Sequence, residues 1–343
     1  MVDLSSLTYE QLEQYTDGLK VPKFRAKQIY RWISRGIFDF EDMTDLPKSF
    51  RQQLQQTCVL ASLKVRRRLV DPDDQTVKYV FELSDGLLIE TVVMHYKHGN
   101  SVCISSQAGC RMGCRFCAST LKGKQRDLSA GEMLAQVAYA NAELGVGHIV
   151  VMGVGEPLDN YDSLLVFLRN VNHPEGLNIS QRHISVSTCG LVDKIRQLAD
   201  EKLQITLSVS LHAPDNETRN RLMPVNQRWP IEELIDACRY YIQKTGRRIS
   251  FEYTLVKDVN DRLSHAQKLY ELLAGMLAHV NLIPVNYVQE RGLYPSDKNT
   301  VRQFYEYLDH KGMNVTVRRT LGGNIDASCG QLRLMEEQDE AVR

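Results

Sequence analysis

The chain has 343 residues, of which 24% are charged and 43% hydrophobic, and its formal net charge at pH 7 is zero. No apolar run approaches the roughly 20 residues that span a bilayer, and the N-terminus carries acidic residues where an export signal has a basic and then apolar stretch. We therefore expect a soluble, cytoplasmic protein without a membrane partner. The zero net charge excludes a global attraction to nucleic acid, so any RNA binding must depend on local clusters.

The first 95 residues predict three helices followed by an antiparallel meander. Thr8 and Gln11 have the spacing of a capping box, which begins a helix. Apolar residues recur near helical spacing between Phe24 and Ile33, and a third helix follows Pro47. Three segments rich in β-branched and aromatic residues come next, separated by turn residues, and they predict strands at 62–70, 76–83 and 87–95.

From about residue 100, short apolar strands alternate with helix-length amphipathic segments. This alternation predicts a parallel sheet wound with helices, and about six repeats without a phosphate-binding GxGxxG sequence favour a barrel or open barrel over a dinucleotide-binding fold. We expect strands at 102–106, 148–153, 183–187, 205–210, 248–255, 279–284 and 314–319. The predicted fold class is α/β: a partial parallel (β/α)6 barrel over residues 96–330, with an accessory region at 1–95 that contacts RNA and a tail at 331–343.

Distinctive polar residues fall where these predicted strands end. In parallel barrels, catalytic and binding residues gather at the C-terminal ends of the strands. The residues are Cys110 to Cys117 after the first strand, Gly155 and Glu156 after the second, Ser187 in the third, Ser210 to His212 at the end of the fourth, and Asn286 after the sixth. The sequence therefore predicts one site at this end of the barrel.

Three of the eight cysteines, Cys110, Cys114 and Cys117, lie on one short segment, which we call the cysteine loop. Eight unevenly spaced cysteines do not suit a disulfide framework in a chain of this size, so the cluster indicates metal binding or catalysis. A structural zinc site needs a fourth ligand, and the nearest histidines, His98 and His148, do not have conventional spacing. An iron–sulfur cluster with three cysteine ligands leaves one iron open to a substrate. A zinc loop lacking one ligand and a coincidental group of thiols are the alternatives.

The sequence around the cysteine loop lacks acidic residues. No Asp or Glu occurs from Thr91 to Arg126, whereas this stretch contains the basic residues Lys97, Arg111, Arg115, Lys122, Lys124 and Arg126. Further basic clusters lie at 66–68, 247–248 and 318–319. Each cluster alone is typical of a solvated surface, but together with the cysteines they favour a phosphate-bearing partner.

The spacing Cys-x3-Cys-x2-Cys, with Phe116 before the last thiol, resembles the signature of the radical S-adenosylmethionine (radical SAM) superfamily. The resemblance implies that the three loop cysteines hold a [4Fe-4S] cluster whose open iron binds S-adenosylmethionine, which one-electron reduction cleaves to a 5′-deoxyadenosyl radical. The segment MGVGEP is similar to the superfamily's glycine–acid motif, in which Gly155 approaches the methionyl group and Glu156 receives its ammonium. Gly-Glu-Pro alone is also an ordinary strand-to-loop turn.

A more specific resemblance extends from residue 101 to residue 334. The motifs SVCISSQAGCRMGCRFCAST, VMGVGEPLDN, ISVSTCG, SLHAPDNETRNRLMP, GRRISFEYTLV, HVNLIPVN and IDASCGQLRL are together similar to the RlmN family, which methylates C2 of adenosine in RNA. The resemblance implies a barrel of the radical SAM type. It assigns the binding of S-adenosylmethionine to Ser187, Ser210, Leu211, His212 and Asn286. Ser and Asn at strand ends also commonly cap helices or form hydrogen bonds with the backbone of loops.

The resemblance also gives roles to residues outside the cysteine loop. Adenine C2 is electron-poor and not nucleophilic, so it cannot take a methyl group from S-adenosylmethionine by direct displacement. In the family, the cysteine that matches Cys329 first takes a methyl group from one S-adenosylmethionine, and a second molecule yields the radical that activates this methyl for addition to C2. Cys103 matches the thiol that resolves the protein–RNA thioether by forming a disulfide with Cys329. Glu90 matches the proposed general base, which burial would have to make more basic.

By resemblance, the substrates are 23S rRNA, at an adenosine of the peptidyl-transferase centre, and tRNA, at the adenosine beside the anticodon. Such a base must be lifted out of the RNA stack. We further expect a one-electron reductant such as flavodoxin and a monomeric enzyme. One alternative is a Cfr-type adenine C8 methyltransferase, although Pro157 and the segment IPVN look more like the C2 enzymes. The other is a non-catalytic RNA-binding protein that contains structural zinc.

Overall fold

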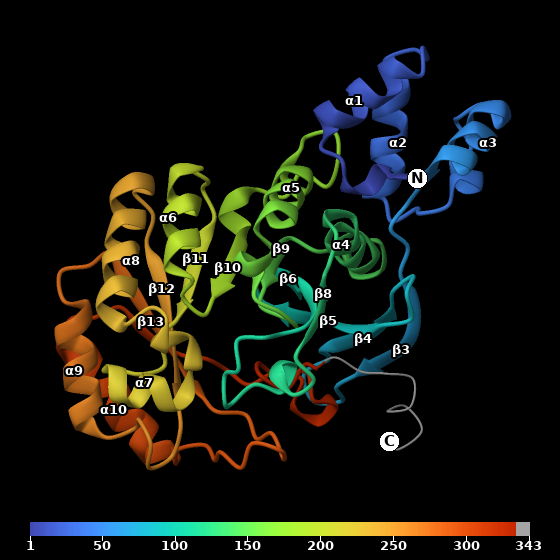
Figure 1. Ribbon diagram of the computed structural model, residues 1–343. Coiled ribbons are helices and arrows are strands. Elements are labelled where there is room, and N and C mark those ends of the chain that lie inside the picture. Colours follow the sequence, from blue (N-terminus) through green and yellow to red (C-terminus); the bar gives the residue numbers. More distant parts are fainter. Residues whose placement is uncertain (334–343) are drawn as a thin grey trace.

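The computed structural model describes residues 1–333, and its centre is a ten-stranded sheet (Figure 1). Parallel strands occupy most of the sheet in the order β14–β13–β12–β11–β10–β9–β6, and three antiparallel strands extend it in the order β5–β4–β3. The parallel strands are β6 (Gly99–Cys103), β9 (His148–Val151), β10 (Ile184–Thr188), β11 (Thr206–Ser210), β12 (Ile249–Leu255), β13 (Ala278–Pro284) and β14 (Val315–Val317). The antiparallel strands are β3 (Lys64–Val70), β4 (Val77–Glu82) and β5 (Leu88–Tyr96).

Helices connect the parallel strands and cover the outer face of the sheet (Figure 1). They are α4 (Ala130–Leu144), α5 (Tyr161–Asn172), α6 (Val192–Asp200), α7 (Asn216–Leu222), α8 (Ile231–Thr245), α9 (Leu263–Leu273) and α10 (Lys298–His310). The sheet does not close, because β3 and β14 remain its two edges. The predicted α/β class and the partial parallel barrel are therefore confirmed.

The core lies between the sheet and these helices because each helix presents one apolar stripe. In α6, for example, Val192, Ile195 and Leu198 recur at helical spacing and are buried. The strands alternate instead: Ile184 and Val186 of β10 are fully buried, while the intervening serines face the other side. That other side is the interior of the barrel, where the polar side chains of the site gather.

The first barrel strand ends earlier than the predicted range of 102–106. The last ladder residue of β6 is Cys103, which lies opposite Val92 of β5 and Val150 of β9. The Ile104 N–H still donates to the Val150 carbonyl oxygen at 3.0 Å before the chain leaves the sheet. Cys103 therefore lies at the C-terminal end of its strand, where barrel sites form.

The three predicted N-terminal helices are present as α1 (Tyr9–Gly18), α2 (Phe24–Ser34) and α3 (Lys48–Thr57). The capping box is formed, since the Gln11 N–H donates to Thr8 Oγ1 at 3.3 Å and the Thr8 N–H donates to Gln11 Oε1 at 2.9 Å. The short strands β1 (Val2–Asp3) and β2 (Cys58–Val59) pair in parallel beside these helices. The Tyr30 hydroxyl of α2 donates to the Asn170 carbonyl oxygen of α5 at 3.1 Å, so the helical region packs on the outside of the barrel.

The meander is structurally continuous with the barrel, because β5 pairs directly with β6. The predicted boundary between an accessory region at 1–95 and a core at 96–330 would thus divide one continuous sheet. This division into domains stays a prediction. Of the predicted tail, residues 334–343 lie outside the described residues. Among residues 1–333, no helix has both the length and the apolar character needed to cross a membrane.

Candidate active site

The cysteine loop is held by a small hairpin that the sequence did not reveal. Its strands, β7 (Gln107–Gly109) and β8 (Lys124–Asp127), pair antiparallel at the C-terminal end of the barrel. Gly109 has φ +80°, and any Cβ there would collide with the carbonyl oxygen of Gly123. The Cys110 N–H donates to that same oxygen at 3.1 Å. Glycine at 109 therefore lets the two ends of the loop meet closely.

Cys110, Cys114 and Cys117 line one cavity, which we call the cluster cavity. Burial raises the pKa of Cys110 to about 12 and also raises the pKa of the other two thiols. Metal binding must therefore displace the thiol protons. Within residues 1–333, no three His, Cys, Asp or Glu side chains converge on a point that suits a single ion. Three soft donors spread around one cavity fit a [4Fe-4S] cluster, whose cysteines each bind a different iron.

Gly155 and Glu156 also line the cluster cavity. Gly155 has φ +113°, and a Cβ there would lie 2.7 Å from Cβ of Gln107, so only glycine suits this close approach. The Glu156 carboxylate is 3% exposed and accepts from the Leu158 N–H at 3.0 Å and the Cys189 N–H at 2.7 Å. Burial raises the pKa of Glu156, against the lowering effect of these hydrogen bonds. Glu156 also lines the cluster cavity, so its carboxylate lies where an ammonium group could pair with it.

A second space adjoins the cluster cavity and shares Cys117, Ser187 and Ser210 with it. We call it the bridging cavity, and His212 and Asn286 also line it. Beyond Gly155 and Glu156, the structure thus brings four of the five other residues assigned to S-adenosylmethionine to the two cavities. Leu211 is the exception: its side chain is fully buried in the main core, its N–H donates to the Glu252 carbonyl oxygen, and its own carbonyl accepts from Arg219.

His212 is a buried neutral ring. Burial lowers its pKa to about 3, so Nδ1 is free to accept the Thr254 N–H at 2.9 Å. Its backbone has φ +54°, which is uncommon for a residue with a side chain. The ring meets the Phe116 ring edge-on at 4.6 Å between centroids. His212 therefore connects the fourth strand with the cysteine loop.

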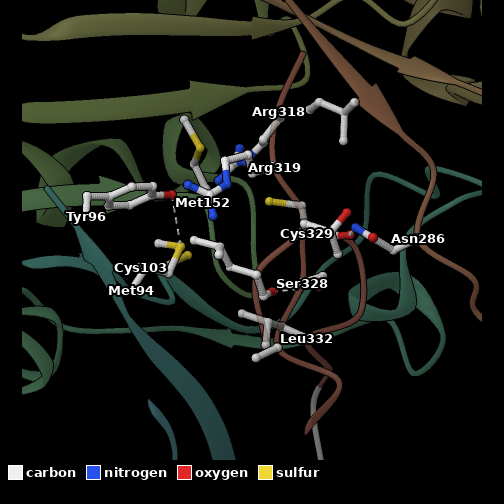
Figure 2. A pocket seen from close by; sticks show the side chains of 14 residues that line it. Met94, Tyr96, Cys103, Met152, Asn286, Arg318, Arg319, Ser328, Cys329 and Leu332 are labelled. Carbon is white, nitrogen blue, oxygen red and sulfur yellow. Dashed lines mark hydrogen bonds between the residues drawn. The ribbon is translucent and has the colours of Figure 1, made fainter. Parts of the chain in front are cut away.

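Cys103 and Cys329 line a third space, which we call the thiol-pair cavity (Figure 2). Cys103 comes from the end of β6 and Cys329 from the loop of residues 318–333, which we call the C-terminal loop. Both thiols are free, and burial raises the pKa of Cys103 to about 12. Cys329, Asn286 and Arg318 also line the bridging cavity, so the thiol pair lies beside the cluster site.

The C-terminal loop is fastened to the cysteine loop and to the barrel. The Ala118 N–H donates to the Gly330 carbonyl oxygen at 2.7 Å, and the Ser119 hydroxyl donates to that of Leu332 at 2.6 Å. The Asn286 side chain donates to the Cys329 carbonyl oxygen at 2.9 Å. In Figure 1 this red segment lies beside the teal segment that carries the cysteine loop. These bonds fix Cys329 next to the cluster cavity.

The meander supplies further anchors for the C-terminal loop. Asp71, in the turn between β3 and β4, is 1% exposed and accepts from the Asn324 N–H at 2.9 Å and the Asn324 amide at 3.0 Å. Burial opposes ionisation of Asp71, but its hydrogen bonds prevail and lower its pKa. Asp74 accepts from the Gly322 N–H at 2.8 Å. In the sequence this turn looks like a simple strand separator.

Glu90 is buried on β5, two residues before Val92, which pairs with Cys103. Its carboxylate forms an ion pair with Lys78 at 2.9 Å and accepts the Arg333 N–H at 2.7 Å. Both partners of the ion pair are nearly inaccessible, with side-chain exposures of 4% and 2%. Glu90 does not itself line the thiol-pair cavity, although Leu332, the residue before its hydrogen-bond partner, does.

Acids from other segments neutralise part of the cationic surface expected around the cysteine loop. Asp159 pairs with Arg111 at 2.5 Å and with Lys124 at 3.0 Å. Arg126 pairs with Glu132 at 2.8 Å. A stretch free of acidic residues in sequence therefore does not produce a uniform positive patch, because folding brings acids to it.

Arg318 also departs from expectation. The sequence grouped it with Arg319 as a basic surface pair, whereas the structure places it on both the thiol-pair and bridging cavities (Figure 2). Cys329 is the main influence raising the pKa of its guanidinium, ahead of the lowering effect of burial. Its position directly after a barrel strand was the available signal.

The comparisons with known proteins agree with this geometry. Residues 104–273 match the radical SAM superfamily, and residues 2–60 match the ribosomal RNA large subunit methyltransferase N-terminal domain. The chain is 51% identical over 335 residues to a probable dual-specificity RNA methyltransferase RlmN of Caldanaerobacter subterraneus subsp. tengcongensis, with 97% of this chain and 98% of the relative covered. A relative with the same name from Lachnospira eligens is 52% identical over 346 residues and covers 99% of both chains.

A solved structure resembles the whole molecule. The crystal structure of a radical SAM methyltransferase from Sphaerobacter thermophilus has a TM-score of 0.93 and 42% identity, with 97% of this chain and 99% of that one covered. SuiB of Streptococcus suis bound to S-adenosylmethionine, at 16% identity and a TM-score of 0.50, shares the fold alone over 63% of this chain and 49% of its own. The family implies a [4Fe-4S] cluster and S-adenosylmethionine, which the cluster cavity fits. The chain is thus a radical SAM protein and belongs to the RlmN family.

Proposed function

We propose that this protein methylates C2 of adenosine in 23S rRNA, and also in tRNA beside the anticodon, through a methylated cysteine and a transient protein–RNA thioether. The observation that carries the proposal is the juxtaposition of Cys103 and Cys329 in one cavity that adjoins the cluster cavity. A methyltransferase that displaced a methyl group directly would have no use for two further thiols there. Two relatives whose names include dual specificity and RNA methylation support the substrate class.

The cluster and S-adenosylmethionine would supply a methyl group for Cys329 and, from a second molecule, a 5′-deoxyadenosyl radical. Cys110, Cys114 and Cys117 would hold the cluster, and Gly155, Glu156, Ser187, Ser210, Leu211, His212 and Asn286 would hold S-adenosylmethionine. Asn286 has a second task, because it fixes the Cys329 carbonyl while lining the same space. Leu211 can contribute only by shaping the backbone at the end of β11, since its side chain lies in the core.

Cys329 would carry the one-carbon unit, and its methyl group, once it has lost a hydrogen atom, would add to C2. The resulting radical adduct would have to lose the C2 proton and one electron, which the oxidised cluster would take up, to leave a thioether. The thiolate of Cys103 would then attack the sulfur of Cys329. This attack forms the S–S bond and breaks the S–C bond, and the electron pair stays on the carbon, which takes up a proton to become the product methyl group. The disulfide needs later reduction, so two electrons must enter before the next turnover.

Glu90 would accept the C2 proton. Its carboxylate is held by Lys78 and the Arg333 N–H, so it must exchange one of these partners to reach substrate. The Arg333 contact belongs to the C-terminal loop that carries Cys329. Movement of this loop during the reaction would therefore free the base and reposition the thiol together.

The remaining parts of the proposal concern partners. The RNA would bind at the open end of the barrel and to the N-terminal region of residues 1–95, since Arg111 of the cysteine loop and Lys124 and Arg126 of β8 are paired with acids. A one-electron donor such as flavodoxin would reduce the cluster. We propose a cytoplasmic, monomeric enzyme.

Nucleoside analysis tests the proposed function directly. The protein is reconstituted anaerobically with iron and sulfide and incubated with S-adenosylmethionine, reductant and an rRNA fragment, and the RNA is digested for mass spectrometry. We expect 2-methyladenosine from the wild type and none from Cys329→Ala. 8-Methyladenosine as the main product would contradict the C2 assignment, and a preparation that contains zinc without labile sulfide would contradict the radical mechanism.

A further inference from the structure

Arg219 of α7 is a fully buried cation, with 0% of its surface exposed. Its guanidinium donates only to uncharged acceptors. Nη2 donates to the carbonyl oxygens of Cys189 at 2.7 Å and Ser210 at 3.2 Å, Nε donates to that of Leu211 at 3.2 Å, and Nη1 donates to Asn226 Oδ1 at 2.9 Å. No carboxylate within residues 1–333 forms an ion pair with it.

An isolated buried charge is unfavourable, because the low-dielectric interior does not replace the water that solvates it. Burial accordingly lowers the pKa of Arg219, but a guanidinium keeps its proton in proteins. Carbonyl dipoles compensate part of the cost. A compensating negative charge is nevertheless missing from the protein itself, which indicates that something bound nearby supplies it.

The position of Arg219 identifies that missing charge. Two of its acceptors, Cys189 and Ser210, belong to residues that line the cluster cavity. Its helix also meets the cysteine loop, since the Leu222 carbonyl oxygen at the end of α7 accepts the Arg115 N–H at 2.9 Å. Among the groups that influence Arg219 electrostatically are the thiols of Cys189 and Cys114, and Cys114 lies on the cysteine loop.

We propose that Arg219 is the buried counter-cation of the iron–sulfur site and raises its reduction potential. Three thiolates outweigh the positive charge of an oxidised [4Fe-4S] core, and one-electron reduction adds a further negative charge. A fixed guanidinium behind the cavity stabilises this reduced state more than the oxidised state, because potentials follow net charge and the local environment. The proposal rests on the cluster that the family implies and is independent of the RNA substrate.

A redox titration of the reconstituted protein, followed by electron paramagnetic resonance, tests the role of the charge. In Arg219→Gln, the ratio of reduced to oxidised cluster at a fixed potential should fall at least about tenfold, equivalent to about 59 mV for a one-electron couple. Arg219→Lys keeps the charge and should stay within about threefold of the wild type. Arg221→Gln removes an exposed cation from the same helix and should change the ratio less than about twofold, because solvent screens it.

A purely structural role makes a different prediction, since Arg219 also connects three loops. In that case the Lys and Gln variants would lose cluster content and shift the potential equally, and this result would overturn the proposal. If Arg219→Gln does not assemble a cluster, Asn226→Asp decides the question. This near-isosteric change keeps an oxygen facing Nη1 and adds the missing carboxylate. We expect it to lower the reduced fraction as well, and an unchanged potential in Asn226→Asp would refute the counter-cation role.

Discussion

The two thiol sets of this molecule are brought together in different ways. The three cysteines of the cysteine loop are close in sequence, and one hairpin with a required glycine holds them. Cys103 and Cys329 lie near opposite ends of the barrel sequence and meet only because the C-terminal loop docks on the meander and the cysteine loop. In the proposed mechanism, the local set supports radical chemistry of a general kind, and the long-range set directs that chemistry to one methyl carbon. Each set can therefore be disturbed without the other.

The largest expected effects come from removing one thiol of each set. Cys114→Ala should lose iron and labile sulfide together with methylation. Cys329→Ala should keep its cluster but lose methylation by at least about a thousandfold, because the carrier of the methyl group is gone. Metal analysis and a methylation assay on the same preparations measure both. Loss of iron in Cys329→Ala would show that the two sets are not separable.

Glu90 tests whether the buried ion pair serves catalysis as well as stability. Glu90→Gln should slow methylation by about 10²–10⁴-fold, as expected for loss of a general base, and should destabilise the fold by about 3–5 kcal/mol, because Lys78 is left buried and unpaired. The double variant Glu90→Gln, Lys78→Met removes both charges. It should regain most of the stability in urea unfolding and none of the activity. Recovered activity would assign Glu90 a structural role only.

The anchoring of the C-terminal loop predicts a smaller effect. Asp71→Ala removes two of the three hydrogen bonds that Asn324 donates and leaves the one to Asp73, so the loop that carries Cys329 should be held less firmly. Methylation should fall roughly tenfold to a hundredfold, because small misplacements of reacting groups cost this much, while iron content stays constant. Asp162→Ala, an exposed aspartate on α5, serves as the matched control. Equal activity of the two variants would show that Asp71 does not position Cys329.

The last effect concerns the bridging cavity and appears only below neutral pH. Because the folded-state pKa of His212 is lowered to about 3, the unfolded chain binds a proton near pH 6.5 that the folded protein does not. Its contribution to stability is therefore complete above pH 6.5 and is lost as pH falls toward 3. The free energy of unfolding of the wild type should decline by roughly 1.4 kcal/mol per pH unit more steeply than that of His212→Asn over this range. Asn tolerates the left-handed backbone at this position. Parallel pH profiles from urea unfolding would contradict the assignment.

Sequence patterns predicted the elements whose signals are local. The capping box at Thr8, the three N-terminal helices and the alternation of strands and helices are all present, because these depend on neighbouring residues. The cysteine loop and Gly155–Glu156 also face one cavity as expected for residues that follow parallel strands.

What the sequence did not predict depends on contacts between distant segments. The turn at Asp71 anchors a loop some 250 positions away, and Arg318 turns into the barrel although its neighbour Arg319 is exposed. The acids that neutralise Arg111 and Lys124 likewise come from elsewhere in the fold. The proximity of Cys103 and Cys329 was expected only through family resemblance, because neither spacing nor periodicity specifies it.

The most direct test of the central claim, that the two thiol sets act in succession on one methyl carbon, is the fate of RNA in Cys103→Ala. This variant keeps the cysteine loop and Cys329 but lacks the resolving thiol. Incubation with S-adenosylmethionine, reductant and an rRNA fragment, followed by denaturing gel electrophoresis and peptide mass spectrometry, should reveal a covalent adduct that joins Cys329 to adenosine through one methylene group. Full methylation without any adduct in Cys103→Ala would contradict the account.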